Sequence, residues 1–412
     1  MSYKFIENTV QIINEDQVIL ANQNNGYFIR ISKEVFDILN IMIDNKLSLG
    51  ELLNKLNDDD DRDYINNLFY KLINNVIQKY GDKDQNKKNE LAAFEITHRC
   101  NLHCKHCCID ADSIISEKED LSTTETKDIL DKLIEWNPKA IMISGGEPML
   151  RDDFIELMKH LRKNYSGKII LSTNGTLIND ENVKVLAECF DKIDISLDGV
   201  DEESCSIVRG NGVFDKVINN VKKIQNTGFL NISLSMAISD KNDHLEEQFI
   251  DLNKTLGTKP LVRIFEPIGR GKYNKSIFSD KSEDEIYIPR DYLSDDYEKI
   301  VIRTCSAGEK ELFISYNGDI YPCVHFMEDL FKLGNIRDIN KLSELNNKYD
   351  NMSLIKLINS NDFKQCEKCK VNLFCWTCLG ELKKLKNNKP AFEYRCKKIK
   401  PVLFKRIWGM EI

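Results

Sequence analysis

Residues 96–108 read ITHRCNLHCKHCC, the most informative stretch of the chain. It directly follows a predicted strand, AAFEIT, and contains a Cys-x3-Cys-x2-Cys array: Cys100, Cys104 and Cys107. Three thiolates this close can hold three corners of a cubane iron–sulfur cluster, which leaves one iron without a protein ligand. The alternative is a zinc site, whose fourth ligand would be one of three nearby histidines: His98, His103 or His106.

The cysteines of the whole chain are unevenly distributed. None of the 13 occurs in the first 99 residues, while four lie within residues 100–108 and five within residues 366–396. The N-terminus lacks the basic and apolar regions of a signal peptide. We therefore expect a cytoplasmic protein, in which structural disulfides are rare. Clustered thiols in a reducing compartment indicate metal ligands.

Three cysteines are not expected to bind metal. Cys108 neighbours Cys107, and adjacent side chains in an extended segment point apart. Cys189 and Cys205 are isolated in the sequence, so they are expected to be buried free thiols.

The composition is that of an ordinary globular protein. Apolar residues make up 42% of the chain and charged residues 30%, and the net charge of −8 argues against a general nucleic-acid binder. No apolar run approaches the roughly 18 residues that span a membrane. We therefore expect neither nucleic acid nor a membrane among the partners.

The first segment, residues 1–82, is predicted to be a winged-helix module. Strand-like alternation runs through YKFIENTVQIINEDQVILAN and GYFIRIS, and helical spacing follows in EVFDILNIMID, LGELLNKLN and YINNLFYKLINNVIQKY. The acidic run 58–61 is expected to be a solvated turn, and the polar residues 81–90 a linker. A winged helix can bind DNA or a peptide, or can simply cap the next domain.

The second segment, residues 91–270, alternates strands and helices. Repeated βα units predict a parallel sheet with right-handed crossovers. Six units are too few for a closed eight-stranded barrel, so we expect an α/β partial (β/α)6 barrel whose chemistry lies at the C-terminal strand ends. The predicted strands are AAFEIT, AIMIS, KIILST, KIDISL, LNISLSMAI and LVRIF. Residues 270–304 are expected to connect this barrel to a cysteine-rich domain at 305–400, closed by a helix or tail.

The cysteine array and the segments after it resemble the radical SAM (S-adenosylmethionine) superfamily. The motifs are the array itself, the GGEP-like SGGEP at 144–148, STNG at 172–175, DISLDG at 194–199, VRG at 208–210 and PIGR at 267–270. The resemblance implies a [4Fe–4S] cluster on the array, whose open iron chelates SAM. It also implies these SAM contacts, with Ser196 and Arg209 at the ribose and carboxylate: Gly145, Gly146, Glu147, Pro148, Ser172, Asn174, Ser196, Asp198 and Arg209.

The C-terminal cysteines resemble the SPASM domain of radical SAM peptide maturases. Its seven-cysteine order is complete, although two residues rather than the more usual three precede Cys378. The resemblance implies two further [4Fe–4S] clusters, three in all. The distal one, auxiliary II, would use Cys366, Cys369, Cys375 and Cys396, and the nearer one, auxiliary I, would use Cys305, Cys323 and Cys378. The fourth site of auxiliary I would be open to a substrate thiolate, or filled by His325, and a pair of zinc knuckles is the alternative to both clusters.

The whole arrangement resembles maturases of ribosomally made peptides of the sactipeptide and ranthipeptide type. In these the N-terminal module is a recognition element for the leader of a precursor peptide, and a flavodoxin or ferredoxin donates electrons. The function implied is the formation of thioether links from a cysteine sulfur to a carbon. Formylglycine formation and carbon–carbon or ether links are the alternatives within the family, and an iron–sulfur winged-helix regulator or a zinc scaffold protein lies outside it. Three carboxylates are candidates for a general base: Asp198, Glu147 and Glu266.

Overall fold

The structure is a computed structural model that describes residues 2–82, 89–112, 120–294, 300–302, 304–345, 361–375 and 378–409. The chain forms two compact units. The terminal unit combines Met1–Lys87, Arg290–Ser306 and Met352–Ile412, and the barrel unit combines Lys88–Pro289 and Ala307–Asn351. In the described part of the chain, no helix is long and apolar enough to cross a membrane.

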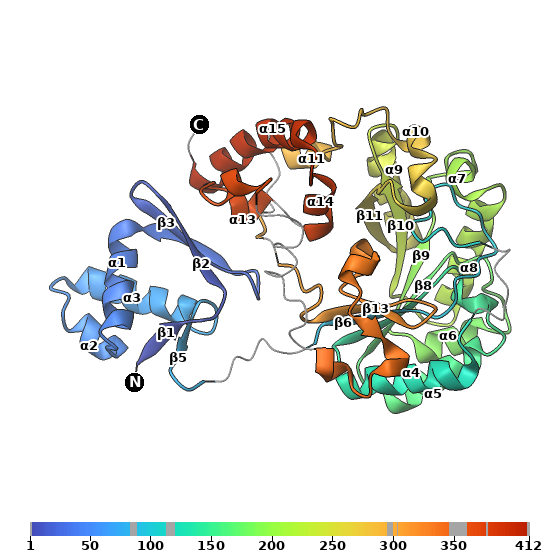
Figure 1. Ribbon diagram of the computed structural model, residues 1–412, viewed down its shortest axis with the longest axis horizontal. Coiled ribbons are helices and arrows are strands. Elements are labelled where there is room, and N and C mark those ends of the chain that lie inside the picture. Colours follow the sequence, from blue (N-terminus) through green and yellow to red (C-terminus); the bar gives the residue numbers. More distant parts are fainter. Residues whose placement is uncertain are drawn as a thin grey trace. The chain divides into compact units, whose positions relative to one another are not determined.

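The terminal unit contains the strands and three helices expected near the N-terminus (Figure 1). An antiparallel sheet has the order β2-β3-β4, and β1 pairs with β5. Serine side chains cap α1 and α2, and Ser48 forms a capping box with Glu51. The elements are β1 (Tyr3–Phe5), β2 (Thr9–Asn14), β3 (Gln17–Asn22), β4 (Phe28–Ser32), α1 (Lys33–Asp44), α2 (Leu49–Leu53), α3 (Asp59–Leu72) and β5 (Ile77–Lys79).

Two expectations for this module are wrong. The acidic run is not a turn, because Asp58 caps α3 through the backbone N–H groups of Asp60 and Asp61, and the other aspartates fill the first turn. Acidic side chains there are favoured by the helix dipole. The third helix also stops at Leu72 rather than near Tyr80. Asn74 adopts a left-handed conformation with φ 65°, and the chain turns back so that β5 pairs with β1.

The C-terminal segment of the terminal unit is helical and packs on the N-terminal sheet. Phe374 meets Phe28 edge-on with ring centroids 5.2 Å apart, and Arg30 donates from Nη1 to the Ile407 carbonyl at 2.8 Å. The expected closing helix is present as α15. The helices are α11 (Arg290–Leu293), α13 (Asn372–Cys375), α14 (Leu379–Lys384) and α15 (Lys389–Trp408).

The barrel unit is built on one nine-stranded sheet with the order β11-β10-β9-β8-β7-β6-β12-β13-β14. Its first six strands are parallel, as the βα repeat predicts. Helices α4, α5, α6 and α8 lie along the outer side of these strands (Figure 1). The strands are β6 (Leu91–Glu95), β7 (Ala140–Ser144), β8 (Lys168–Thr173), β9 (Lys192–Ser196), β10 (Ile232–Ile238) and β11 (Lys259–Ile264).

The connecting helices are short and locally encoded. Ser122 and Glu125 form a capping box at the start of α4, which ends where Asn137 adopts φ 51°. Apolar residues of these helices and of the strands form one continuous core. The helices are α4 (Thr123–Trp136), α5 (Phe154–Asn164), α6 (Val183–Cys189), α7 (Glu202–Arg209), α8 (Val213–Asn226), α9 (Glu246–Leu256) and α10 (Lys275–Phe278).

The sheet extends beyond the segment expected to form the barrel. Strand β12 (Glu311–Ile314) pairs in parallel with β6, and β13 (Asp319–Tyr321) and β14 (Gly334–Asn335) continue antiparallel. The first hairpin of the cysteine-rich segment therefore belongs to the barrel sheet.

Candidate functional site

The cysteine loop follows β6 at the C-terminal end of the parallel strands, and its sulfurs accept hydrogen bonds. Cys100 and Cys104 are buried and Cys107 is half-buried. The Leu102 N–H lies 3.4 Å from Cys100 Sγ, the Ala111 N–H 3.3 Å from Cys107 Sγ, and Arg209 Nη1 3.6 Å from Cys104 Sγ. Burial raises the pKa of the Cys100 thiol to about 11. Hydrogen-bond donors aimed at each sulfur are suited to thiolates that bind a cluster. Burial disfavours the negative charge of a thiolate, and the positive charge of bound iron would offset that cost.

The glycines after β7 support this loop directly. A Cβ on Gly145 would lie 2.3 Å from the Thr97 carbonyl oxygen, and one on Gly146 would lie 2.2 Å from that of Arg99. The Gly146 N–H donates to Thr97 O at 2.9 Å. The sequence marked these glycines only as SAM contacts, which stay predictions, and the structure shows that they let the backbone approach the cysteine loop.

Glu147 is fully buried and joins the ends of β7 and β8. Its carboxylate accepts hydrogen bonds from the Thr173 hydroxyl at 2.8 Å, the Asn174 N–H at 2.8 Å and the Met149 N–H at 3.2 Å. Burial outweighs these bonds and raises the pKa of Glu147 to about 7. In this structure the side chain organises the strand ends, and its role as a SAM contact stays a prediction.

Asp198, directly after β9, is the centre of a buried ionic cluster. It accepts hydrogen bonds from Arg209 Nε at 2.6 Å and from the Ala237 N–H at 2.6 Å, and its Oδ2 lies 3.0 Å from His106 Nε2. Burial alone would raise the pKa of Asp198, but Arg209 and His106 outweigh it and hold that pKa well below its usual range. Since His106 lies between two of the cysteines, this cluster ties β9 and α7 to the cysteine loop.

The other expected SAM contacts lie at the same edge of the sheet. Asn174 donates from Nδ2 to Asn101 Oδ1 at 2.8 Å and lies 3.9 Å from Cys100 Sγ. Ser172 and Ser196 are half-buried near the ends of β8 and β9, and Pro148 is buried at the start of a 3-10 turn. The structure therefore gathers the expected residues around one loop, and their contacts with SAM stay predictions.

Sequence reasoning named the PIGR motif but missed its role. Arg270 is buried, donates from Nε to the Cys104 carbonyl at 3.0 Å and lies 3.3 Å from Asp110. A Cβ on Gly269 would lie 2.5 Å from the Cys107 carbonyl oxygen. The motif follows β11, so it shares the sheet edge with the cysteine loop and clamps it. Its position after a parallel strand was the signal that could have revealed this role.

A second missed contact joins the cysteine loop to the β12–β13 hairpin. The His98 ring stacks on Tyr316, in the hairpin turn, with centroids 4.6 Å apart. His98 Nδ1 lies 2.6 Å from Oε1 of Glu95, a buried residue at the end of β6. The sequence spacing gave no sign of this pairing because it depends on β12 joining the barrel sheet.

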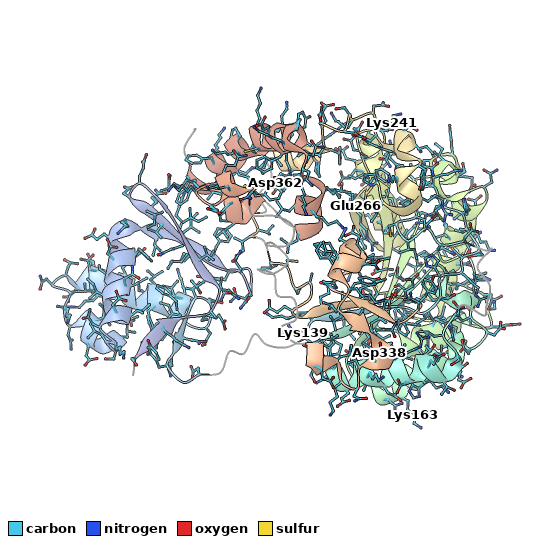
Figure 2. All side chains as sticks on the ribbon, in the orientation of Figure 1. Lys139, Lys163, Lys241, Glu266, Asp338 and Asp362 are labelled. Carbon is cyan, nitrogen blue, oxygen red and sulfur yellow. The ribbon has the colours of Figure 1, made fainter. Side chains whose placement is uncertain are left out.

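The three candidate bases have different surroundings. Asp198 and Glu147 are both engaged by hydrogen-bond donors inside the protein. Glu266 is half-buried and follows β11 at the C-terminal end of the parallel strands (Figure 2). None of the three is assigned as a base by this geometry.

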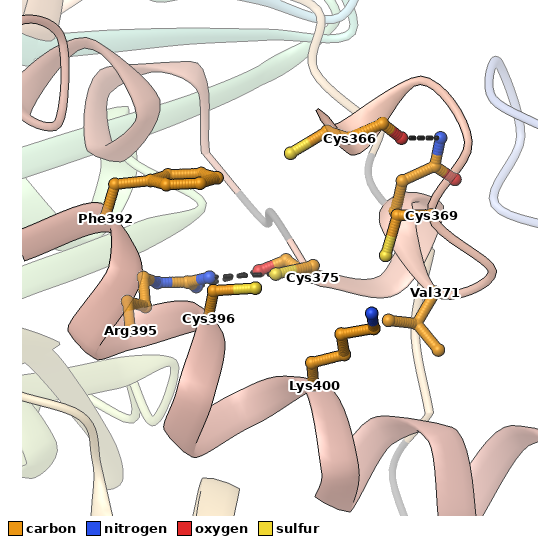
Figure 3. A pocket seen from close by; sticks show the side chains of 9 residues that line it. Cys366, Cys369, Val371, Cys375, Phe392, Arg395, Cys396 and Lys400 are labelled. Atoms are coloured by element: carbon orange, nitrogen blue, oxygen red, sulfur yellow. Dashed lines mark hydrogen bonds between the residues drawn. The ribbon is translucent and has the colours of Figure 1, made fainter. Parts of the chain in front are cut away.

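In the terminal unit, four cysteines line one small pocket. Figure 3 shows the sulfurs of Cys366, Cys369, Cys375 and Cys396 pointing into the same space. Within the described ranges, no three His, Cys, Asp or Glu side chains are arranged to hold a single metal ion. The thiols of a four-iron cluster bind different irons, so they lie further apart than ligands that share one ion. The donor set and the pocket fit the expected distal cluster.

The remaining expected ligands are divided between the units. Cys305 and Cys378 belong to the terminal unit and Cys323 to the barrel unit, so the auxiliary I site, with or without His325, stays a prediction. Cys378 is the N-cap of α14, where its sulfur accepts a hydrogen bond from the Gly380 N–H at 3.3 Å.

The three cysteines outside these arrays are not grouped with them. Cys108 is exposed, whereas Cys189 and Cys205 are buried in the barrel core. Cys205 donates to the Leu197 carbonyl at 3.0 Å.

Comparison with known proteins supports the two modules. Residues 94–252 match the radical SAM superfamily, and residues 305–371 match the SPASM family, an iron–sulfur cluster-binding domain. Mycofactocin maturase MftC of Mycolicibacterium smegmatis is 28% identical over 268 residues, which cover 59% of this chain and 66% of that protein. Fe-coproporphyrin III synthase of Methanosarcina barkeri is 32% identical over 207 residues, 48% of this chain and 49% of that protein. The chain thus spans under two thirds of the length of these relatives.

Solved structures share the fold. SuiB of Streptococcus suis bound to S-adenosylmethionine aligns with a TM-score of 0.55 and 16% identity, covering 94% of this chain and 98% of SuiB. The protein anSMEcpe with bound AdoMet aligns with a TM-score of 0.57 and 18% identity, covering 77% of this chain and 97% of anSMEcpe. The matched segments make this chain an enzyme that contains a radical SAM domain at residues 94–252 and a SPASM domain at residues 305–371. Its cofactors are SAM and a [4Fe–4S] cluster, with further iron–sulfur clusters in the SPASM domain.

Proposed function

We propose that this enzyme installs thioether links in a ribosomally made precursor peptide, joining a cysteine sulfur to a carbon of another residue. The observation that supports radical chemistry is the loop of three hydrogen-bonded cysteine sulfurs. Cys100, Cys104 and Cys107 would hold a cluster with one open iron, and SAM bound there supplies a 5′-deoxyadenosyl radical that removes a hydrogen atom from carbon.

The residues around the loop would hold and aim SAM. Buried Arg209 carries a positive charge next to Cys104 and is fixed by Asp198, so a carboxylate could be bound there without a change of geometry. The glycines and the PIGR motif lock the loop backbone, which restricts where a radical can form.

A peptide substrate is supported by the relatives and by the N-terminal module. MftC is named as a maturase, SuiB has been solved bound to precursor peptide SuiA, and anSMEcpe has been solved with the Cp18Cys peptide. The sheet of the module has β2 and β4 at its edges, where an extended leader could add as a strand. On α3, Tyr64 and Tyr70 are exposed aromatic side chains that could contact such a leader.

The C-terminal cysteines would bind two auxiliary clusters. The distal cluster would lie on Cys366, Cys369, Cys375 and Cys396, and the nearer one on Cys305, Cys323 and Cys378, with its fourth site open to a substrate thiolate. A substrate sulfur held there would lose its proton before the bond to carbon forms, and the surplus electron would pass to the cluster. A flavodoxin or ferredoxin is the proposed electron donor for the first cluster.

Co-expression with a short cysteine-containing precursor, followed by mass spectrometry, tests this function. Each thioether link removes two hydrogens from the peptide and one free thiol. Epimerisation leaves the mass unchanged, and formylglycine formation removes the sulfur from cysteine. Loss of two hydrogens with retention of every free thiol would contradict thioether formation and favour a carbon–carbon or ether link.

A further inference from the structure

A buried arginine lies against one of the four thiols of the distal pocket. Arg395, on α15, is 6% exposed and donates from Nη1 to Cys375 Sγ at 3.0 Å and from Nη2 to the Cys375 carbonyl at 2.7 Å. Figure 3 shows its guanidinium directed toward Cys375, with the Phe392 ring above it in this view. The guanidinium is therefore close enough to act electrostatically on whatever the sulfur binds.

A second cation lines the same pocket. Lys400 lies one helical turn after Cys396 on α15 and lines the pocket beside it. Among the described residues that line the pocket, Arg395 and Lys400 carry charge and none is a carboxylate, while Glu381 lies 3.8 Å from Arg395. Two cations and one rather distant carboxylate leave the wall of the pocket with a net positive charge.

The loop of Cys100, Cys104 and Cys107 has a different balance of positive and negative side chains. Arg209, which contacts Cys104, is paired with Asp198 at 2.5 Å, and Arg270 lies 3.3 Å from Asp110. The cations near these thiols thus have close carboxylate partners. The excess of positive charge is a feature of the distal pocket.

We infer that Arg395 and Lys400 raise the reduction potential of the distal cluster, so that it accepts and retains an electron readily. This inference rests on the proposed function, which assigns a cluster to this pocket. Four thiolates give the oxidised cluster a negative charge, and reduction adds one electron and no atoms. Nearby positive charge and hydrogen bonds to the sulfurs favour the more negative, reduced form. The distal cluster would then be the final acceptor of the electron that the nearer cluster takes up during link formation.

The test is a redox titration of the anaerobically purified full chain, followed by electron paramagnetic resonance. Replacing the three loop cysteines by alanine removes the first cluster from the spectrum, and the signal that Cys369→Ala abolishes identifies the distal cluster. In Arg395→Gln, the ratio of reduced to oxidised distal cluster at the wild-type midpoint should fall about tenfold, a shift of about 59 mV for one electron. Lys400→Gln should shift the midpoint in the same direction.

Two further variants separate charge from shape. Arg395→Lys keeps the charge and should keep most of the wild-type midpoint, whereas Glu381→Gln removes a negative charge and should shift the midpoint upward. Lys398→Gln is the matched control, because this exposed lysine lies two residues after Cys396 and so points away from it. Its midpoint should equal that of the wild type.

An unchanged midpoint in Arg395→Gln with full iron content would overturn the inference, as would equal shifts in Arg395→Lys and Arg395→Gln. If Arg395→Gln fails to retain iron, the midpoints of Lys400→Gln and Glu381→Gln test the inference in its place. The inference expects a lower midpoint in the first and a higher one in the second, and shifts of the same sign would refute it. Zinc in place of iron in the wild-type pocket would instead refute the cofactor assignment of the proposed function.

Discussion

The buried ion pair between Asp198 and Arg209 offers a sharp test of how the cysteine loop is held. Asp198→Asn keeps the size of the side chain but removes its charge. The Arg209 guanidinium, 7% exposed and 2.5 Å from the carboxylate, would then be buried without a counter-charge. Removing one partner of a buried pair typically costs about 3–5 kcal/mol.

That cost is expected to be local and independent of pH near neutrality. Because Arg209 and His106 hold the pKa of Asp198 well below its usual range, the wild-type carboxylate stays ionised in the folded protein. Its stabilisation is present above the pKa of the unfolded chain and is lost only as pH falls towards the folded value. The difference between wild type and variant should therefore be constant from about pH 6 to pH 8.

Hydrogen exchange of the cluster-free protein measures this effect. Peptides from β9 and α7 should exchange about a hundredfold or more faster in Asp198→Asn, since each 1.4 kcal/mol corresponds to about a factor of ten. Asp180→Asn is the control, because Asp180 pairs with Lys223 at 3.0 Å on the surface, where such pairs contribute at most about 1 kcal/mol. Equal protection of these peptides in the wild type and in Asp198→Asn would refute the reasoning.

Three further substitutions have defined outcomes. Gly146→Ala places a methyl group 2.2 Å from the Arg99 carbonyl oxygen and should lower the free energy of unfolding in urea by about 1–3 kcal/mol; an unchanged midpoint would show that the loop can move aside. Burial raises the pKa of Glu147 from its usual 4.5 to about 7, so the free energy of unfolding of the wild type should fall as pH rises through this interval. Measured against Glu147→Gln, the fall should be about 3 kcal/mol. Parallel pH profiles of stability for the two proteins would contradict this prediction. Tyr70→Ala should weaken leader binding about tenfold by fluorescence anisotropy, whereas replacement of Tyr273, a still more exposed tyrosine in the barrel unit, should not; equal affinities of wild type and Tyr70→Ala would exclude Tyr70 from the leader site.

Local sequence patterns were sufficient to predict the parallel strands of the barrel. Each of the six predicted parallel strands is present, because short apolar runs between amphipathic helices leave little choice of pairing. Failures arose where tertiary contacts override local pattern. The third helix of the N-terminal module keeps its apolar spacing past Leu72, but the pairing of β5 with β1 is not visible in any local window.

The candidate site was predictable in its thiols and less so in its supports. Regular spacing revealed Cys100, Cys104 and Cys107, since metal ligands must be close in sequence when they share a loop. The pairing of His98 with Tyr316 and the contact of Arg395 with Cys375 join residues that are distant in sequence or on different helices. Such contacts follow from how the sheet and helices pack, so a single sequence does not disclose them.

The most direct test of the central claim is the formation of 5′-deoxyadenosine from SAM under reducing, oxygen-free conditions. The wild-type enzyme should release 5′-deoxyadenosine and methionine, and single replacements by alanine at Cys100, Cys104 or Cys107 should abolish both products. Cys108→Ala, which removes the exposed neighbouring thiol, should leave them unchanged. Continued cleavage of SAM by any of the three loop variants would contradict the assignment of these thiols to the cluster.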